Sequence, residues 1–261
     1  MDLKLDQKKV FVSGSTQGIG YAVAEACLAE GASVVVNGRA EQRVAEAVEQ
    51  LRATAPGGDV SGIAADFTDP VQVQALLESL EDVDVLVNNV GLFDVAPFTD
   101  IEDDDWLRYF EINVMSSVRL SRHLLGAMLE KGWGRIIFIG TESAVDVPGD
   151  MIHYGATKAA SLALSNGLAK LTRGTGVTVN TVLGGPTYSD GVAGVVEQIA
   201  SAHSMSPDEL KSSLVRPSSL IQRFIEPSEI ADLVAYLASP RSSATNGASL
   251  RADGGVLSTI V

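Results

Sequence analysis

The sequence has a single cysteine, few basic residues and no long hydrophobic run. With only Cys27 available, no disulfide can form within the chain. Even the apolar stretch from Val83 to Val90 is short and interrupted by polar residues, whereas a transmembrane helix needs roughly 20 apolar residues. The segment from Met1 to Lys9 lacks the apolar core of a signal peptide. These absences predict a cytoplasmic protein that does not insert into a membrane.

Positive charge is also scarce, with 19 basic residues against 33 acidic ones and a formal net charge of -14. Such a charge repels a nucleic-acid backbone, so we expect no nucleic-acid partner. A few well-placed cations could still bind one dinucleotide. His123, His153 and His203 show no metal-ligand spacing with one another or with Cys27, and we therefore predict no metal site.

What the sequence does contain is an alternation of short β-branched runs with longer helical patterns. The expected strands are Val10 to Val12, Ser33 to Val36, Gly62 to Ala64, Val83 to Val87, Arg135 to Ile139, Val177 to Val182 and Ala248 to Arg251. The expected helices are Ile19 to Ala29, Glu41 to Ala53, Val71 to Leu80, Asp104 to Glu130, Tyr154 to Thr172 and Ser228 to Leu237. This alternation predicts a Rossmann-like, doubly wound α/β fold with about seven parallel strands, helices on both faces and a single domain over residues 1–261.

The alternation breaks between Gly184 and Pro227, where Gly, Pro and Ser accumulate. Only two weak helical segments occur there, Val192 to Ala202 and Pro207 to Val215. A long irregular segment inside a compact domain is usually a functional loop. We therefore expect a substrate lid at about residues 184–226.

A glycine-rich turn follows the first expected strand and leads directly into a helix. Glycine tolerates positive φ and the close approach of a ligand, and the N-terminus of a helix attracts phosphate. The turn therefore predicts a pyrophosphate site, although its spacing differs from the Gly-x-Gly-x-x-Gly form and a plain tight turn is the alternative. The residues concerned are Gly14, Ser15, Thr16, Gln17, Gly18, Ile19 and Gly20.

The end of the second strand, Asn37-Gly38-Arg39, indicates which dinucleotide would bind. An NAD site carries an acidic residue here, which binds the ribose 2′-hydroxyl. Gly38 stands in that place, and the guanidinium of Arg39 next to it suits a 2′-phosphate. We therefore predict NADP(H) in preference to NAD(H), with a solvated surface arginine as the alternative.

Two more groups follow the third and fourth strands, at the sheet edge where ligands bind in doubly wound folds. Asp66 and Phe67 would lie at the adenine, and Asn89, Val90 and Gly91 nearer the middle of the cofactor. A helix N-cap at Asp66 and a turn or strand-end cap at the asparagines are the alternatives. We predict these five residues as cofactor ligands.

Tyr154 and Lys158 are four residues apart in an expected helix, and therefore lie on the same face. A tyrosine with a pKa near ~10 is a poor acid or base at neutral pH, but a neighbouring cation stabilises its phenolate and lowers that pKa. The spacing predicts a proton-transfer pair, with an accidental spacing as the alternative.

Together these motifs resemble the short-chain dehydrogenase/reductase family, in the single-domain form that includes 3-ketoacyl-carrier-protein reductases. The resemblance covers nearly the whole chain and extends to Asn113, to Asn180 and to Asp253-Gly254-Gly255. It implies that Tyr154 gives or takes the proton, that Lys158 also holds the nicotinamide ribose, and that Asn113 positions a water in a proton relay.

The chain departs from the family pattern at two places. The family's serine, thirteen residues before the tyrosine, is Thr141 here. Its hydroxyl could still donate to the substrate oxygen, although its β-branched side chain is restricted, and Ser143 is the alternative. Gly184-Gly185-Pro186-Thr187 replaces the family's Pro-Gly-aliphatic sequence, and the resemblance implies that Gly185 and Thr187 contact the cofactor.

The resemblance implies an NADP(H)-dependent oxidoreductase that transfers a hydride between nicotinamide and a carbonyl or secondary alcohol. Phe93 to Phe98, Val145 to Ile152 and Tyr188 to Ile221 would surround the substrate, and their mostly apolar composition favours a moderately hydrophobic ketone. A homotetramer is expected, with a homodimer as the alternative. An NAD-linked alcohol dehydrogenase and a non-catalytic dinucleotide-binding sensor are the rival functions.

Overall fold

The computed structural model describes residues 1–189, 192–193, 196, 200 and 205–260. This part of the chain contains a sheet of seven parallel strands in the order β3-β2-β1-β4-β5-β6-β7. The strands are β1 (Lys9–Val12), β2 (Ser33–Gly38), β3 (Val60–Ala64), β4 (Val85–Asn88), β5 (Trp133–Thr141), β6 (Gly176–Gly184) and β7 (Ser249–Ala252). The predicted doubly wound α/β fold is confirmed.

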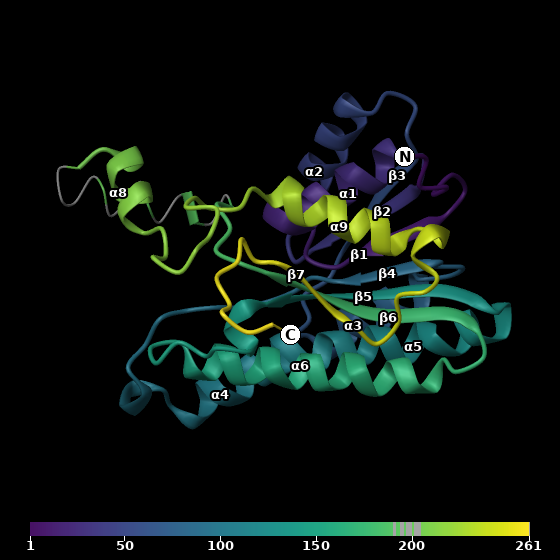
Figure 1. Cartoon of the computed structure of the whole chain (residues 1–261). Coiled ribbons are helices and arrows are strands. Elements are labelled where there is room, and N and C mark those ends of the chain that lie inside the picture. The colour runs from purple at the N-terminus through teal and green to yellow at the C-terminus, as the bar shows by residue number, and fades with distance from the viewer. Residues whose placement is uncertain (190–191, 194–195, 197–199, 201–204, 261) are drawn as a thin grey trace.

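Helices cover both faces of the sheet (Figure 1). One face carries α1 (Gly18–Ala29), α2 (Glu41–Thr54) and α9 (Pro227–Ala238), and α1 packs against α9. The other face carries α3 (Pro70–Ser79), α5 (Ser116–Lys131) and α6 (Ile152–Leu171), and α4 (Asp103–Phe110) packs against α6.

The strands read as continuous apolar runs because both faces of the sheet are buried. Side chains along a strand point alternately to opposite faces. In β1, Val10 and Val12 belong to the hydrophobic cluster with Ile230 of α9, whereas Phe11 between them belongs to the cluster with Leu120 of α5. One strand therefore contributes to two cores, which is typical of parallel sheets covered on both sides.

The strand order reverses direction between β1 and β4, and this reversal locates the ligand-binding edge. In doubly wound sheets the ligand crevice lies outside the carboxyl ends of the strands at this switch point. The Ser13 amide donates to the Val87 carbonyl over 3.1 Å, and the Ser13 hydroxyl accepts from the amide of Asn89 over 3.0 Å. The glycine-rich turn after β1 is thereby joined to the segment after β4.

The prediction of one continuous helix over Asp104 to Glu130 is wrong, because the helix is interrupted. Glu111–Met115 form a π-helical turn between α4 and α5. Such turns contain one extra residue and are frequent at functional sites. Here the turn contains Asn113, a predicted site residue. Hydrophobic periodicity could not reveal it, because one inserted residue shifts the apolar pattern by a single position.

The segment expected to be a lid leaves and rejoins the fold at neighbouring points. Thr187 pairs with Ile225 in an isolated parallel bridge, and Tyr188 donates to the Ile225 carbonyl over 2.9 Å. Between them, α8 (Pro207–Ser213) projects away from the sheet, as Figure 1 shows. The expected helix at 207–215 is present, whereas the one at 192–202 lies mostly outside the described residues. None of the described helices has the length and apolarity required to cross a membrane.

Candidate active site

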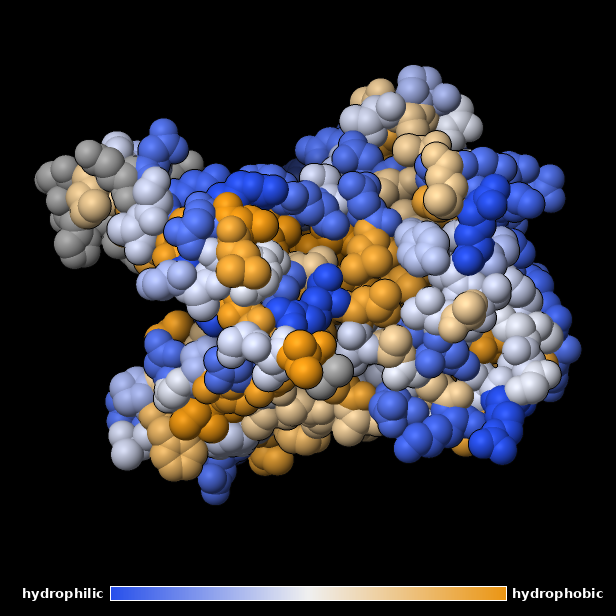
Figure 2. Space-filling view, in the orientation of Figure 1, coloured by the Kyte–Doolittle hydropathy of each residue, from blue (hydrophilic) through white to orange (hydrophobic). Residues whose placement is uncertain are grey.

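A cavity of about 310 Å³ lies at the carboxyl edge of the sheet. Figure 2 shows hydrophobic residues gathered around the hollow between the α8 segment and the helices below it. The predicted residues that line the cavity are Ile19, Asn89, Gly91, Thr141, Ser143, Tyr154, Lys158, Gly185 and Thr187. The structure therefore brings the catalytic candidates together with part of the predicted cofactor site.

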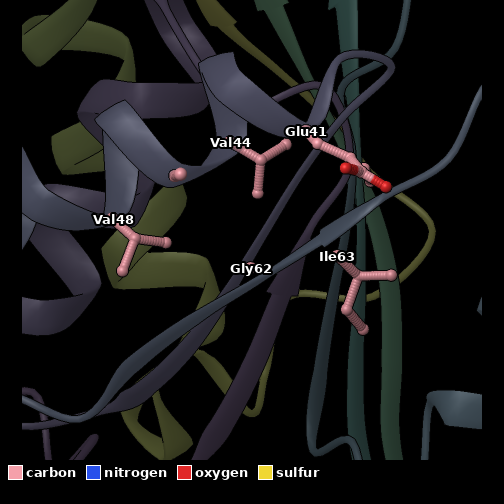
Figure 3. Close-up of a pocket in the computed structure, with 7 residues that line it drawn as sticks. Glu41, Val44, Val48, Gly62 and Ile63 are labelled. Atoms are coloured by element: carbon pink, nitrogen blue, oxygen red, sulfur yellow. The ribbon is translucent and has the colours of Figure 1, made fainter.

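A larger cavity of about 520 Å³ lies elsewhere, between α2 and β3 at the outer edge of the sheet (Figure 3). Val44 and Val48 of α2 and Ile63 of β3 line it, and Glu41 is the only charged residue in its lining. These residues include no group of side chains that could act together on a bound molecule. The cavity beside Tyr154 is therefore the candidate active site.

The glycine-rich turn has the backbone geometry that its sequence predicts. Gly14 and Gly18 have φ angles of 61° and 59°, a region that favours glycine. A Cβ on Gly20 would lie 2.4 Å from the Asn89 side-chain nitrogen and 2.5 Å from the Gly14 carbonyl oxygen. The turn therefore requires these glycines, and it directs the N-terminus of α1, where a phosphate binds favourably, toward the crevice.

Two buried or half-buried asparagines hold this turn in place. Asn37 Oδ1 accepts from the Gly14 amide over 3.1 Å, and Asn37 Nδ2 donates to the Ile63 carbonyl over 3.0 Å. Asn89 Nδ2 donates to the carbonyls of Ser13 and Gly14 over 3.1 and 2.7 Å. Both residues shape the glycine-rich turn through its backbone, and their direct contact with a cofactor remains a prediction.

The predicted 2′-phosphate site is exposed and contains the guanidinium of Arg39. A Cβ on Gly38 would lie 2.5 Å from the Thr16 methyl carbon, so glycine here lets Thr16 pack against β2. Arg39 is exposed, and within the described residues it forms no ion pair. Hydrogen bonds from Thr68 hold the pKa of Asp66 below its usual value, and the Arg39 charge acts in the same direction.

The remaining predicted cofactor residues differ in how they are placed. Phe67 is 5% exposed and packs in the core cluster with Val73 and Leu76, so its side chain supports the sheet from within. Ser15 is buried, and its hydroxyl donates to the Val12 carbonyl over 2.7 Å. Gln17 is the exposed N-cap residue of α1.

Tyr154 and Lys158 lie one turn apart on α6, as predicted, with Lys158 Nζ 6.0 Å from the centre of the Tyr154 ring. Lys158 Nζ donates to the Ile139 carbonyl over 3.1 Å, and burial lowers the pKa of Lys158 to about 8. Burial raises the pKa of Tyr154 above its usual range. A hydrogen bond with Thr141 opposes this rise, and the charge of Glu142 adds to it.

The expected fall in the pKa of Tyr154 therefore does not occur in this structure, because desolvation outweighs the hydrogen bond with Thr141, which is the contact that lowers this pKa. A desolvated phenol favours its neutral, protonated form. At neutral pH Tyr154 carries the proton that an acid would donate to a carbonyl oxygen.

The side chain of Asn113 connects the loop after β4 to helix α6. Its Oδ1 accepts from the Leu92 amide over 2.6 Å, and its Nδ2 donates to the Leu92 carbonyl over 2.9 Å and to the Thr157 hydroxyl over 3.0 Å. A Cβ on Gly91 would lie 3.1 Å from Lys158 Nζ. Asn113 thus fixes the loop after β4 against α6, and its role in a water relay remains a prediction.

The two candidate hydroxyls at the end of β5 both bond to Glu142, which was not among the predicted site residues. Thr141 Oγ1 donates to Glu142 Oε2 over 2.5 Å, and Ser143 Oγ donates to Glu142 Oε1 over 3.2 Å. Arg216 lies 3.2 Å from the same Oε1. All four residues line the cavity. The position of Glu142 between Thr141 and Ser143 in the sequence could have indicated a functional residue. Its burial and its ion pair with Arg216 could not be predicted from the sequence.

The segment after β6 also depends on close backbone packing. A Cβ on Gly185 would lie 2.6 Å from the Asp253 carbonyl oxygen, so only glycine fits there. Thr187 Oγ1 donates to the Gly185 carbonyl over 2.8 Å. Both residues line the cavity, while the Thr187 hydroxyl is directed to its own backbone.

Comparison with known proteins identifies the family. The family model described as short chain dehydrogenase matches residues 8–200. YvaG, an uncharacterized oxidoreductase of Bacillus subtilis, is 43% identical over 100% of both chains. The 3-oxoacyl-acyl-carrier-protein reductase FabG of Salmonella typhimurium is 30% identical, over 97% of this chain and 99% of its own.

Solved structures of similar fold support the same family. L-sorbose reductase from Gluconobacter frateurii, in complex with NADPH and L-sorbose, superimposes with a TM-score of 0.94 at 30% identity over 100% of both chains. An actinorhodin polyketide ketoreductase with NADPH gives a TM-score of 0.88 at 29% identity, over 97% of this chain and 98% of that one. The chain belongs to the short-chain dehydrogenase/reductase family, and it is an oxidoreductase that acts on CH–OH and C=O groups.

Proposed function

We propose that this protein is an NADP(H)-dependent ketone reductase in which Tyr154 protonates the carbonyl oxygen. The observation that carries the proposal is the position of a half-buried Tyr154 in the cavity wall, next to Lys158 and to the Thr141 hydroxyl. A raised pKa keeps this phenol protonated at neutral pH, which suits the acid of a reduction better than the base of an oxidation.

The residues present fit a dinucleotide cofactor. Gly14, Gly20 and Gly185 allow the close packing that shapes the crevice, since a Cβ on each would lie within 3.1 Å of neighbouring protein atoms, and the turn after β1 leads into the N-terminus of α1. These residues would hold the pyrophosphate and the nicotinamide end, with Asp66 near the adenine. When bound, the reduced nicotinamide supplies the hydride.

Exposed Arg39 supports NADP(H) over NAD(H). Its guanidinium would bind a 2′-phosphate, and Gly38 offers no carboxylate that would repel one. The NADPH and L-sorbose complex of the Gluconobacter frateurii enzyme is consistent with a phosphorylated cofactor in a related chain.

The protein's own contribution to the reaction is orientation and a proton. Tyr154 would donate its proton to the substrate oxygen, and the Lys158 ammonium would stabilise the phenolate left behind. The hydroxyl of Thr141, or that of Ser143, would turn from Glu142, to which it donates here, and would donate a hydrogen bond to the same oxygen as charge develops on it. Asn113 would keep the loop after β4 and α6 at a fixed separation.

Apolar walls support a moderately hydrophobic ketone as substrate. Phe93, Met151 and Leu214 line the cavity. The segment at 184–226 would act as a lid over this space, since its ends are held together at Thr187 and Ile225.

The test is NADPH and NADH oxidation against a panel of ketones by wild type and Tyr154→Phe. We expect consumption of NADPH, and a loss of roughly 10²–10⁴-fold in Tyr154→Phe without loss of NADPH binding, which fluorescence titration measures. Preference for NADH with alcohol oxidation would support the NAD-linked dehydrogenase instead. Cofactor binding with no turnover of any carbonyl or alcohol would support the sensor.

We also propose that the protein is a homotetramer, as expected from the family. Leu107 and Phe110 of α4 are 69% and 44% exposed, and Leu171 at the end of α6 is 62% exposed. Apolar side chains exposed on neighbouring helices are suited to association. Light scattering coupled to size-exclusion chromatography measures the mass, and a monomer would contradict the proposal.

A further inference from the structure

The cavity wall beside Tyr154 carries an ion pair that the proton chemistry above does not use. The Glu142 side chain is 5% exposed, and its Oε1 lies 3.2 Å from Arg216 on the segment that follows α8. The Arg216 side chain is 35% exposed. The two residues come from distant parts of the chain and meet in the lining of the cavity.

Stability alone gives no reason for this pair. Replacing a buried ion pair by apolar residues of similar volume is often neutral or stabilising. An apolar wall would also serve an apolar substrate better, because such a substrate would cover the carboxylate and the guanidinium without bonding to them. An unpaired buried polar group weakens binding. The pair therefore indicates a polar group on the substrate.

The charges of the pair restrict what that group can be. Arg216 is neutralised by Glu142, and the third charged residue in the lining, Lys158, lies at Gly91 on the predicted cofactor side. An anionic substrate group would meet the Glu142 carboxylate and be repelled. A hydroxyl, by contrast, both donates and accepts hydrogen bonds, and it can bond a carboxylate and a guanidinium at once.

Thr141 connects this ion pair to Tyr154, where the substrate carbonyl would react. Its hydroxyl bonds both to Tyr154 and to Glu142 Oε2, so the carboxylate is one side chain away from the phenol. A substrate carbonyl at Tyr154 would therefore have its adjacent carbon close to Glu142 and Arg216.

We propose that Glu142 and Arg216 are specificity-determining residues that recognise a neutral α-hydroxy ketone. The substrate hydroxyl donates to Glu142 and accepts from Arg216, while the apolar side chains Phe93, Met151 and Leu214 surround the rest of the molecule. This inference rests on the proposed ketone reduction and narrows its substrate class.

The experiment compares kcat/KM for matched ketones that differ by one hydroxyl, acetoin against butanone and benzoin against deoxybenzoin, with pyruvate as an anionic comparator. Wild type, Glu142→Gln and Arg216→Met are measured with NADPH. The control is Arg223→Met, which removes an exposed arginine paired with Glu229 near the same segment but outside the cavity lining. The ratio between two substrates within one variant is independent of how much of that variant folds.

We expect wild type and Arg223→Met to prefer the hydroxy ketone by roughly 10- to 100-fold, and both cavity variants to bring the ratio close to one. Three results would overturn the inference while leaving ketone reduction intact: equal wild-type rates on the two ketones, a preference for pyruvate, or equal losses on both ketones in the cavity variants. The last would mean that the pair only holds the lid segment. If no carbonyl is reduced in a Tyr154-dependent manner, the proposed function fails first, and this inference with it.

Discussion

The two ends of the crevice use buried polar side chains in different ways. At the glycine-rich turn, Asn37, Asn89 and Ser15 bond to backbone amides and carbonyls. At the end of β5, Thr141 and Ser143 bond to the side chain of Glu142. The first arrangement fixes the path of the chain, and the second connects groups that can exchange protons or bind a substrate.

The glycine-rich turn and the cavity also differ in the charge of their polar groups. The buried polar groups of the turn are neutral amides and hydroxyls, whereas the cavity holds Lys158, Glu142 and Arg216 close to Tyr154. Burying charged or titratable groups costs stability, and such groups concentrate at functional sites. Substitutions at the turn should therefore act through shape and stability, and substitutions in the cavity through chemistry.

The largest expected effect is that of Lys158→Met. Loss of the ammonium should reduce kcat by roughly 10²–10⁴-fold, because the phenolate left after proton transfer loses its stabilising charge. The same variant should be more stable than wild type at pH 7, by roughly 1–3 kcal/mol, since burial lowers the pKa of Lys158 from 10.5 to about 8 and this penalty disappears.

The size of this stability effect depends on pH. Between about pH 8 and 10.5 the unfolded chain keeps a proton on Lys158 that the folded chain has released, so wild type gains stability from this group as pH rises through that window. The advantage of Lys158→Met should therefore shrink from pH 7 to about pH 10, as measured by urea unfolding at each pH. A variant less stable than wild type at pH 7 would contradict this account of the site.

Next in size is the contrast between Thr141→Ala and Ser143→Ala. Because Thr141 bonds to Tyr154 whereas Ser143 bonds only to Glu142 among the side chains described, Thr141→Ala should lower kcat by roughly 10²–10³-fold, as for an oxyanion donor. Ser143→Ala should cost about tenfold or less. Steady-state kinetics at saturating NADPH measure both, and equal, small losses would exclude both hydroxyls from the chemistry.

At the turn, Gly20→Ala should act on stability. The added Cβ would lie 2.4 Å from Asn89 Nδ2 and 2.5 Å from the Gly14 carbonyl, so the turn must shift at a cost of roughly 1–3 kcal/mol. The control is Gly126→Ala, at an exposed position of α5 with nothing within 4 Å of the new Cβ, which should stabilise by about 0.5–1 kcal/mol. Thermal unfolding distinguishes them, and similar shifts for both would refute the packing argument.

Sequence patterns predicted the fold well because the signals are local. Alternating apolar runs, the positive-φ glycines and the four-residue spacing of Tyr154 and Lys158 each follow from the geometry of a single element. The π-helical turn at Glu111–Met115 and the burial of Phe67 depend on packing between elements, which periodicity does not report.

The candidate site was less predictable for the same reason. The pKa of Tyr154 depends mainly on how much solvent the surrounding elements remove, which the spacing of Tyr154 and Lys158 does not report. The Glu142–Arg216 pair joins β5 to the lid segment, and no spacing in the sequence connects them. Asparagines at strand ends proved to be a scaffold for the turn, a role that composition cannot separate from ligand binding.

The smallest expected effect concerns Arg39, an exposed charged residue at the turn end of the crevice. Arg39→Ala removes an exposed guanidinium that forms no ion pair within the described residues, so stability should change by less than about 0.5 kcal/mol. The KM for NADPH should rise about tenfold while that for NADH stays constant, because only the 2′-phosphate loses its partner. Parallel KM measurements with the two cofactors provide the check, with Arg43→Ala on the exposed side of α2 as the control. An equal rise in KM for both cofactors would mean that Arg39 contributes to binding the adenosine end in general. The turn would then contain no charge that selects between the two cofactors, and the charges of the crevice would be confined to the cavity.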